Sequence, residues 1–475
     1  MSVVTNTTTI GAIELPSRRN TELALLGFAV VIPVFAYLNV GLALDGEVPS
    51  GMLGYGLGLG LLAGVAHLVV RKFAKYADPL LLPLATLLNG LGLVLIWRLD
   101  QSPRLNARSD FAPQAMNQLM YSALGIALFV GVLLVLKDHR ILQRFTYISM
   151  AASLVLLLLP IVPGLGADVF GAKIWIRVGG FSIQPGEFAK IVIAVFFSGY
   201  LMVKRDALAL ASRRFMGLYL PRGRDLGPIL TIWAMSLLVL IFENDLGTSL
   251  LFFGMFVIML YVATERTSWI VIGLLMSAGG AVVVASFASH VQSRVAAWID
   301  PFGCRETAPA GSNMLNACDQ MTQVLMSFGS GGVLGTGLGE GNSDLISFAA
   351  NSDFIFATVG EELGLAGVMA FLLLYGLIIE RGIRTALAAR DPFGKLFAIG
   401  LSGAFALQVF VVAGGVMGLI PLTGMTMPFL AAGGSSVIAN WALIGILIRI
   451  SDTARRPAPA PAPSPDAEMT QVVRP

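Results

Sequence analysis

The stretch NSDFIFATVGEELGLAGVMAFLLLYG, residues 351–376, decides the fold. It is apolar over a length that can cross a bilayer, because a transmembrane helix needs about 20 mainly apolar residues. Its first half nevertheless carries Asp353, Glu361 and Glu362. Ionisable groups are costly in hydrocarbon and normally face a bundle interior or a water-filled cavity. The stretch therefore predicts a membrane-embedded helix bundle with a polar site near one end of this helix.

The composition of the whole chain is that of an integral membrane protein. Of its 475 residues 56% are hydrophobic and 12% are charged, whereas soluble domains have about 25% charged residues. We expect an all-α polytopic membrane helix bundle. Its twelve predicted transmembrane helices cover residues 23–44, 52–70, 79–97, 119–136, 145–162, 184–203, 227–242, 248–263, 269–288, 356–380, 394–416 and 436–449.

The distribution of basic residues predicts that both chain ends are cytoplasmic. With that orientation, 23 of the 31 Lys and Arg residues fall in cytoplasmic segments and 8 fall outside, as the positive-inside rule requires. The net charge of +3 reflects this bias and is no evidence for nucleic-acid binding, and we expect no nucleic-acid partner. The polar segments between 289 and 355 are then extracytoplasmic.

The pattern of apolar runs divides the chain into four parts. Residues 1–22 form a cytoplasmic N-terminal tail, residues 23–70 form two transmembrane helices, and residues 79–450 contain the other ten predicted helices and the extracytoplasmic loop 289–355. Residues 451–475 include the Pro/Ala-rich sequence PAPAPAPSPDAE. Such a composition cannot bury a core, so we expect this tail to be disordered.

Two polar motifs lie at the outer ends of predicted helices. In GAKIWIRVGGFSIQPGEFAK, residues 171–190, Pro185 suits a helix N-terminus, and Glu187 and Lys190 share one helix face. They could form a structural ion pair or part of a wall that binds a charged headgroup. In FENDLGTS, residues 242–249, Asp245 could cap the next helix or take part in chemistry.

The loop 289–355 contains both cysteines and a glycine-rich run. Cys304 and Cys318 lie in an oxidising compartment, where disulfides persist, and we expect them to pair. Closing such a loop would stabilise the fold by about 3 kcal/mol in the entropic model. The run SFGSGGVLGTGLGEGNSD, residues 327–344, lacks the Gly-Lys-Ser/Thr ending of a nucleotide loop. We expect a glycine hairpin at the membrane surface.

The three acids of the opening stretch have different predicted roles. On a straight helix Glu361 lies about 12 Å below Asp353, because each residue rises 1.5 Å, and Glu362 points to the opposite face. We therefore expect Asp353 to meet substrate at the outer water boundary. Glu361 and Glu362 are predicted to be structural and to bind neighbouring helices.

Five ordered motifs together resemble the SEDS family of peptidoglycan glycosyltransferases, which comprises the RodA and FtsW branches. They are EFAK at 187–190, NDLGTS at 244–249, GSGGVLGTGLG at 329–339, SDFIFATVGEELG at 352–364 and IPLTGMTMPF…GGSS at 420–436. The resemblance covers about residues 79–450 and implies a core of ten transmembrane helices. The two additional N-terminal helices resemble actinobacterial members of the RodA branch.

The resemblance implies polymerisation of lipid II on the outer leaflet, beside a class B penicillin-binding protein. It places Asp353 at the family's catalytic aspartate, and a single inverting displacement needs one general base. The predicted substrate-binding residues are Lys190, Glu187, Gln184, Lys173, Arg177, Asp245 and Arg294.

Other functions and the need for a metal stay open at this point. We predict a divalent cation, Mg²⁺ or Mn²⁺, held partly by diphosphate oxygens, because the sequence offers no dedicated metal cage. A division role of the FtsW type and a lipid II flippase or transporter are the alternatives to a polymerase of cell elongation.

Overall fold

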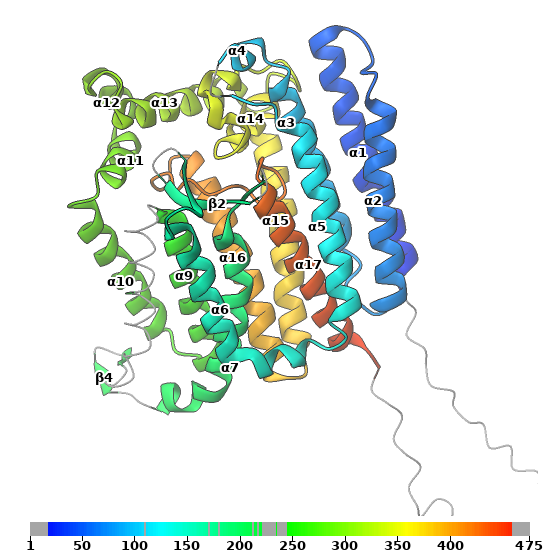
Figure 1. Cartoon of the computed structure of the whole chain (residues 1–475), viewed down its shortest axis with the longest axis vertical. Coiled ribbons are helices and arrows are strands. Elements are labelled where there is room, and N and C mark those ends of the chain that lie inside the picture. The colour runs from blue at the N-terminus through cyan, green and yellow to red at the C-terminus, as the bar shows by residue number, and fades with distance from the viewer. Residues whose placement is uncertain are drawn as a thin grey trace, which may run out of the picture.

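The computed structural model describes residues 18–457, with gaps at 109–110, 170–171, 179–180, 211–212, 216–217, 221–233 and 235–244. Figure 1 shows a bundle of long helices that run roughly parallel to one another. The fold is the expected all-α membrane bundle.

Eleven described helices are long and apolar enough to cross a membrane. Ten of the twelve predicted spans match them closely, one is displaced, and the span predicted at 227–242 lies outside the described residues. The spanning helices are α1 (Arg19–Asp45), α2 (Met52–Phe73), α3 (Leu81–Asp100), α5 (Ala115–Val135), α6 (Thr146–Leu158, flanked by 3₁₀ turns at His139–Phe145 and Leu159–Ile161), α7 (Pro185–Leu210), α9 (Leu246–Thr264), α10 (Ser268–Ala285), α15 (Gly364–Ala388), α16 (Pro392–Val416) and α17 (Gly434–Arg455).

The displaced span is the one that follows Asp353. The prediction of a single helix over 356–380 was wrong, because the chain forms a short helix α14 (Ile355–Glu362) and then a separate α15. The break falls at Leu363 and Gly364, and Gly364 has a φ of +65°, which a right-handed helix does not allow. The angles derived for a straight helix therefore do not apply across this junction.

The segment predicted as a long loop, 289–355, is mostly helical. It contains α11 (Ser289–Ile299), α12 (Pro301–Thr307) and α13 (Asn313–Gly331), followed by 3₁₀ turns at Ser343–Ile346 and Phe348–Asn351. Side-chain caps start two of these helices, since Asp300 accepts a hydrogen bond from the Gly303 N–H and Ser312 accepts one from the Leu315 N–H. A further short helix, α4 (Pro103–Asn106), follows α3.

Two small antiparallel sheets were not predicted. The strands β1 (Gly166–Val169), β2 (Ala172–Val178) and β3 (Phe181–Ile183) pair in chain order ahead of α7. In the second sheet β4 (Arg213–Phe215) pairs with β5 (Leu218–Leu220), between α7 and α9.

The helices differ in how much of their surface is covered. The centre of the bundle is built from α3, α16 and α17, whose spanning windows are mostly buried, whereas α2, α6, α10 and α15 are largely uncovered. At one edge of the bundle α1 and α2 pack together, and α1 lies against α3 (Figure 1). The two additional N-terminal helices join the core through α3 and, for α2, also through α5.

The two ends of the bundle carry different elements. We call the end that carries α11–α14 the cavity end, and the end that carries the last turns of α2, α15 and α17 the opposite end (Figure 1). At the opposite end, the prediction of disorder from residue 451 onward was wrong for its first residues, because α17 continues to Arg455. Buried Ser451 and Asp452 accept hydrogen bonds from the backbone N–H groups of Asp78 and Tyr76. Residues 1–17 and 458–475 lie outside the described residues.

Candidate functional site

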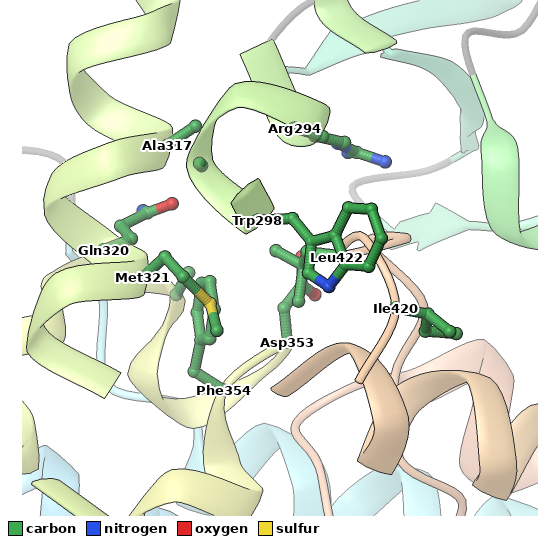
Figure 2. Close-up of a pocket in the computed structure, with 11 residues that line it drawn as sticks. Arg294, Trp298, Ala317, Gln320, Met321, Asp353, Phe354, Ile420 and Leu422 are labelled. Carbon is green, nitrogen blue, oxygen red and sulfur yellow. The ribbon is translucent and has the colours of Figure 1, made fainter. Parts of the chain in front are cut away.

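A cavity of about 180 Å³ opens beside Asp353 at the cavity end. Figure 2 shows that its walls come from four places in the chain, namely α11, α13, the turn before α14 and the segment between α16 and α17. The residues that line it are Arg294, Ala297, Trp298, Ala317, Gln320, Met321, Ala349, Asp353, Phe354, Ile420 and Leu422. The cavity therefore has mainly apolar walls, with one carboxylate and one guanidinium.

Asp353 lies in an irregular turn, not in a helix. The turn connects Asn351 to the start of α14. It is fixed on both sides, because the Phe354 N–H donates to the Ala349 carbonyl over 3.2 Å and the Ala432 N–H donates to the Asn351 carbonyl over 2.8 Å. The backbone thus holds the Asp353 carboxylate at the cavity.

The surroundings of Asp353 make its carboxylate a better base. Burial raises the pKa of Asp353 to about 6; the charge of Arg294 opposes this rise and the charge of Asp245 adds to it. Within the described part of the chain, no Lys or Arg forms an ion pair with Asp353. A carboxylate with a pKa just below neutral is suited to accept a proton in a reaction.

Arg294 is positioned by the segment between α16 and α17. Its guanidinium donates to the Thr423 carbonyl over 2.7 Å, and one turn later the Trp298 indole donates to the Gly418 carbonyl over 2.9 Å. These two bonds attach α11 to the segment 418–423, so the cation and the indole keep their places on the cavity wall.

Asp245 caps α9. Its carboxylate accepts hydrogen bonds from both the backbone N–H, over 2.9 Å, and the hydroxyl of Thr248. Burial raises its pKa, while these bonds and the charge of Arg294 lower it. The structural role that the sequence allowed is present, and Asp245 also belongs to the charged surroundings of Asp353. A role in substrate binding stays a prediction.

Glu187 and Lys190 belong to a buried polar cluster between α7, α16 and α17. The Lys190 ammonium, which is 1% exposed, donates to Glu187 over 2.6 Å, to Gln408 over 2.8 Å and to Asn440 over 3.1 Å. An ammonium has three donors, so each has an acceptor here. This arrangement fits the structural ion pair, and a contact with a headgroup stays a prediction.

The other predicted binding residues lie before α7. Lys173 and Arg177 are exposed and, with Trp175 between them, occupy the same face of β2, because alternate residues of a strand share a face. The backbone N–H of Gln184 donates to the Ser435 hydroxyl over 2.9 Å. The structure does not bring these three residues to the walls of the Asp353 cavity.

Glu361 and Glu362 hold the glycine-rich segment. Glu361 accepts hydrogen bonds from the Ser330 hydroxyl, over 3.2 Å, and the Asn342 N–H, over 2.9 Å. Glu362 accepts from the Gly339 N–H over 3.0 Å and pairs with Arg98 of α3 over 2.5 Å. Both acids are buried. The predicted contacts with neighbouring helices are present, through Ser330 of α13 and Arg98 of α3, and the backbone of the glycine-rich segment adds further partners.

The glycine-rich segment packs tightly on the junction between α14 and α15. A Cβ atom at Gly335, which has a φ of +85°, would lie 2.2 Å from the Glu362 carbonyl oxygen. Only glycine fits so close an approach without strain. Gly335 therefore serves packing at this junction.

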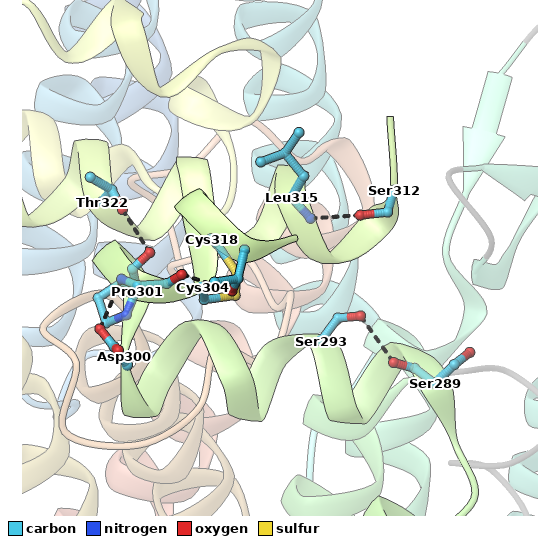
Figure 3. Close-up of a disulfide and its surroundings, with 11 residues drawn as sticks. Ser289, Ser293, Asp300, Pro301, Cys304, Ser312, Leu315, Cys318 and Thr322 are labelled. Carbon is cyan, nitrogen blue, oxygen red and sulfur yellow. Dashed lines mark hydrogen bonds between the residues drawn. A yellow bond between two sulfur atoms is a disulfide. The ribbon is translucent and has the colours of Figure 1, made fainter. Parts of the chain in front are cut away.

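A disulfide joins Cys304 of α12 to Cys318 of α13, with a Cα–Cα distance of 5.9 Å. Figure 3 shows a second link beside it, in which the Thr322 hydroxyl donates to the Pro301 carbonyl over 3.2 Å. Since α13 supplies Ala317, Gln320 and Met321 to the cavity, these links fix one of its walls. Gln320 and Trp298 had no predicted role. Only the cavity identifies them, because polar and aromatic residues in a loop have many other uses.

No group of three His, Cys, Asp or Glu side chains that could hold a metal ion is found among the described residues. Asp353 lines the cavity, and Asp245 is close enough for the charges of the two carboxylates to interact. This donor set suits a cation such as Mg²⁺, which takes one or two carboxylates and completes its shell with phosphate oxygens and water.

The fold and the site define a polytopic membrane protein with an acidic centre at one end of its bundle. A family model described as Cell cycle protein, of the FtsW, RodA and SpoVE proteins, matches residues 79–456. The chain belongs to this family, in agreement with the resemblance seen in its motifs.

Curated relatives extend over almost the whole chain. The peptidoglycan glycosyltransferase RodA of Mycobacterium tuberculosis is 49% identical over 93% of this chain and 92% of its own length, and that of Mycobacterium leprae is 47% identical over the same shares. The probable peptidoglycan glycosyltransferase FtsW of Trichlorobacter lovleyi is 31% identical over 80% of this chain and 94% of its own length.

Solved structures share the fold. The crystal structure of the Thermus thermophilus rod shape determining protein RodA has a TM-score of 0.53, with 23% identity over 80% of this chain and 98% of that chain. A chain from a structure titled as a peptidoglycan synthase complex that coordinates polymerization and crosslinking has a TM-score of 0.53 and 22% identity, over 85% of this chain and 98% of that chain.

Proposed function

We propose that this chain is a peptidoglycan glycosyltransferase of the RodA type that polymerises lipid II with Asp353 as its general base. The activity class follows from relatives that carry this name at 47–49% identity over most of the chain. The observation that carries the catalytic assignment is the Asp353 carboxylate, which faces a cavity, forms no ion pair among the described residues and has a pKa of about 6.

The proposed reaction is a single displacement with inversion. The 4-hydroxyl oxygen of the acceptor sugar attacks the anomeric carbon of the donor, and the bond from that carbon to the lipid diphosphate breaks. The hydroxyl proton passes to Asp353, which returns it to water. The Arg294 guanidinium, fixed by Thr423, would stabilise the negative charge that develops on the leaving diphosphate.

A divalent cation, Mg²⁺ or Mn²⁺, belongs to the proposal as a companion of the diphosphate. When bound it would neutralise diphosphate charge. Asp245 is the carboxylate that would contribute a protein ligand, with the diphosphate oxygens and water completing the shell. Removal of divalent cations with a chelator is then expected to stop polymerisation, and added Mg²⁺ or Mn²⁺ to restore it.

We place the chain in the bacterial cytoplasmic membrane with Asp353 at the outer face and both termini in the cytoplasm. The excess of Lys and Arg in the predicted cytoplasmic segments supports this orientation. A cysteine introduced at Ser293, beside Arg294, is expected to react with a membrane-impermeant maleimide in whole cells, and one at Gln143, which is exposed at the opposite end of the bundle, is not. The reverse pattern would overturn the orientation.

We further propose a class B penicillin-binding protein as the partner and cell elongation as the process. Identity is higher to RodA relatives than to an FtsW relative, and one structural neighbour comes from a synthase complex. Depletion of the chain is expected to give rounded cells, whereas filaments of undivided cells would indicate a division role.

The decisive experiment uses the purified chain with its partner, lipid II and a divalent cation, and measures glycan length. Polymer from the wild type and none from Asp353→Asn is the expected result. Movement of lipid II across the membrane without polymer would identify a flippase and overturn the proposal.

A further inference from the structure

A second, larger cavity of about 740 Å³ lies at the opposite end of the bundle, away from Asp353. Five of its lining residues are cations, and they come from four places in the chain. Arg18 precedes α1, Lys75 follows α2, Arg381 and Arg384 lie in the last turns of α15, and Arg455 ends α17.

Acidic side chains neutralise only part of this charge. Asp78 pairs with Arg455 over 2.5 Å and with Arg381 over 3.8 Å, and Glu380 pairs with Arg381 and Arg384. For Arg18 and Lys75 the described part of the chain offers no acidic partner. Five cations against two carboxylates leave the cavity strongly positive.

Buried Asp78 also fixes the direction of two of the cations. It is fully buried, and its own position is set because its backbone N–H donates to the Ser451 hydroxyl over 3.0 Å. The guanidinium groups of Arg455 and Arg381 therefore converge on the same point from two different helices. Each guanidinium has five donors, so both keep donors for a ligand in the cavity.

The same cavity has an apolar wall. Leu25, in the second turn of α1, and Leu80, directly before α3, line it together with the cations. Leu25 lies next to the apolar part of α1, and Leu80 begins the apolar run of α3. A free phosphate gains nothing from an apolar wall, whereas a phospholipid carries apolar acyl chains directly next to its anionic headgroup.

We infer that this cavity binds the phosphate headgroup of an anionic phospholipid, with the acyl chains running along α1. Basic pockets between transmembrane helices are suited to such headgroups, and arginine binds phosphate oxygens through paired N–H donors. The site is independent of the polymerase reaction, because no residue lining the cavity beside Asp353 lines this one.

The test measures lipid retention by the purified full-length chain in detergent with native mass spectrometry. The probes are dioleoylphosphatidylglycerol and dioleoylphosphatidylcholine. We expect tighter binding of the anionic lipid by the wild type. The variant R18Q/K75Q removes the two cations without acidic partners and should raise the Kd for phosphatidylglycerol about tenfold or more.

The control variant is K137Q/R144Q. Lys137 and Arg144 are exposed and lie beside His139, which pairs with Asp391 after α15, so they occupy the same end of the bundle outside the cavity. The control loses the same charge and should change the Kd by less than about twofold. If R18Q/K75Q unfolds, R384Q takes its place, because the Arg384 side chain is mostly exposed.

Three results would overturn the inference. They are equal retention of the two lipids by the wild type, an equal Kd for the cavity variant and the control, and displacement of the lipid by inorganic phosphate or by a polyglutamate peptide. The last result would assign the cavity to a free phosphate or to an acidic protein segment.

Discussion

Asp353 and the pair Glu361–Glu362 lie within ten residues of one another, yet their surroundings differ in kind. Asp353 sits in an irregular turn at a cavity and, among the described residues, forms no ion pair. Glu361 and Glu362 are buried at the end of α14, where they bind backbone N–H groups and, for Glu362, Arg98. Of these three neighbouring acids, only the one whose charge has no fixed partner is available for chemistry.

The largest effect is expected from Asp353→Asn. This change keeps the size of the side chain but removes the base, so polymerisation of lipid II should fall by a factor of about 10² to 10⁴. The melting temperature in detergent should stay near that of the wild type. Asp319→Asn is the control, because Asp319 forms a partly exposed pair with Arg305 over 2.9 Å. Similar rates for the two variants would contradict the catalytic assignment.

Glu362→Gln should have the opposite effect to Asp353→Asn, namely a large loss of stability and no direct loss of activity. The change leaves the buried Arg98 guanidinium without its counter-charge, which costs about 3–5 kcal/mol. The melting temperature in detergent should fall clearly, and activity should be lost only as the protein unfolds. Glu340→Gln, in the same glycine-rich segment but exposed, should melt like the wild type. An unchanged melting temperature for Glu362→Gln would show that the pair with Arg98 is not structural.

Removing the disulfide should have a smaller and more local effect. Cys304→Ser with Cys318→Ser opens a loop of 14 residues, which costs up to about 3 kcal/mol in the entropic model. Limited proteolysis should then cut between α12 and α13 before the rest of the chain. Wild-type protein treated with a reductant should give the same fragments, and resistance of both samples would refute the role of the disulfide.

The smallest expected effect is a shift of the pH profile. Asp353 acts as a base only when deprotonated, and its pKa is about 6, so the polymerisation rate should fall as the pH drops through about 6. Arg294 lowers this pKa by its charge, so Arg294→Gln should move the acidic limb to higher pH, in addition to any loss of maximal rate. Arg305→Gln, whose side chain lies outside the cavity, should leave the limb in place. If the acidic limb does not move in Arg294→Gln, the charge of Arg294 does not influence the pKa of the catalytic base.

Much of the architecture could be predicted because hydrophobic length is a local property. Eleven of the twelve predicted runs correspond to a described spanning helix, with the run at 356–380 displaced, and the runs at 23–44 and 436–449 lie within a few residues of α1 and the first part of α17. The continuation of α17 to Arg455 was missed, because its last turns are polar. They are stabilised by hydrogen bonds from the backbone of Tyr76 and Asp78, which lie between α2 and α3 and are distant in sequence. The break at Gly364 was missed for a similar reason, since Gly335 and Glu362 set it through contacts in space.

The candidate site could be predicted only in part. The motif analysis selected Asp353, Arg294 and Asp245, which the fold brings into one charged region. It could not show that Lys190 would be enclosed by Gln408 and Asn440, because those partners lie more than 200 positions away in the sequence. Trp298 and Gln320 could not be predicted either, since no local sequence signal distinguishes a cavity wall from any other surface.

The sequence by itself determined that this protein crosses the membrane many times and that it belongs to a family of known motifs, because apolar length and motif order are written along the chain. Only the tertiary structure decided which carboxylate is available for chemistry. The protonation and partners of an acid depend on the charges and dipoles packed around it, and those come from helices that are remote in sequence.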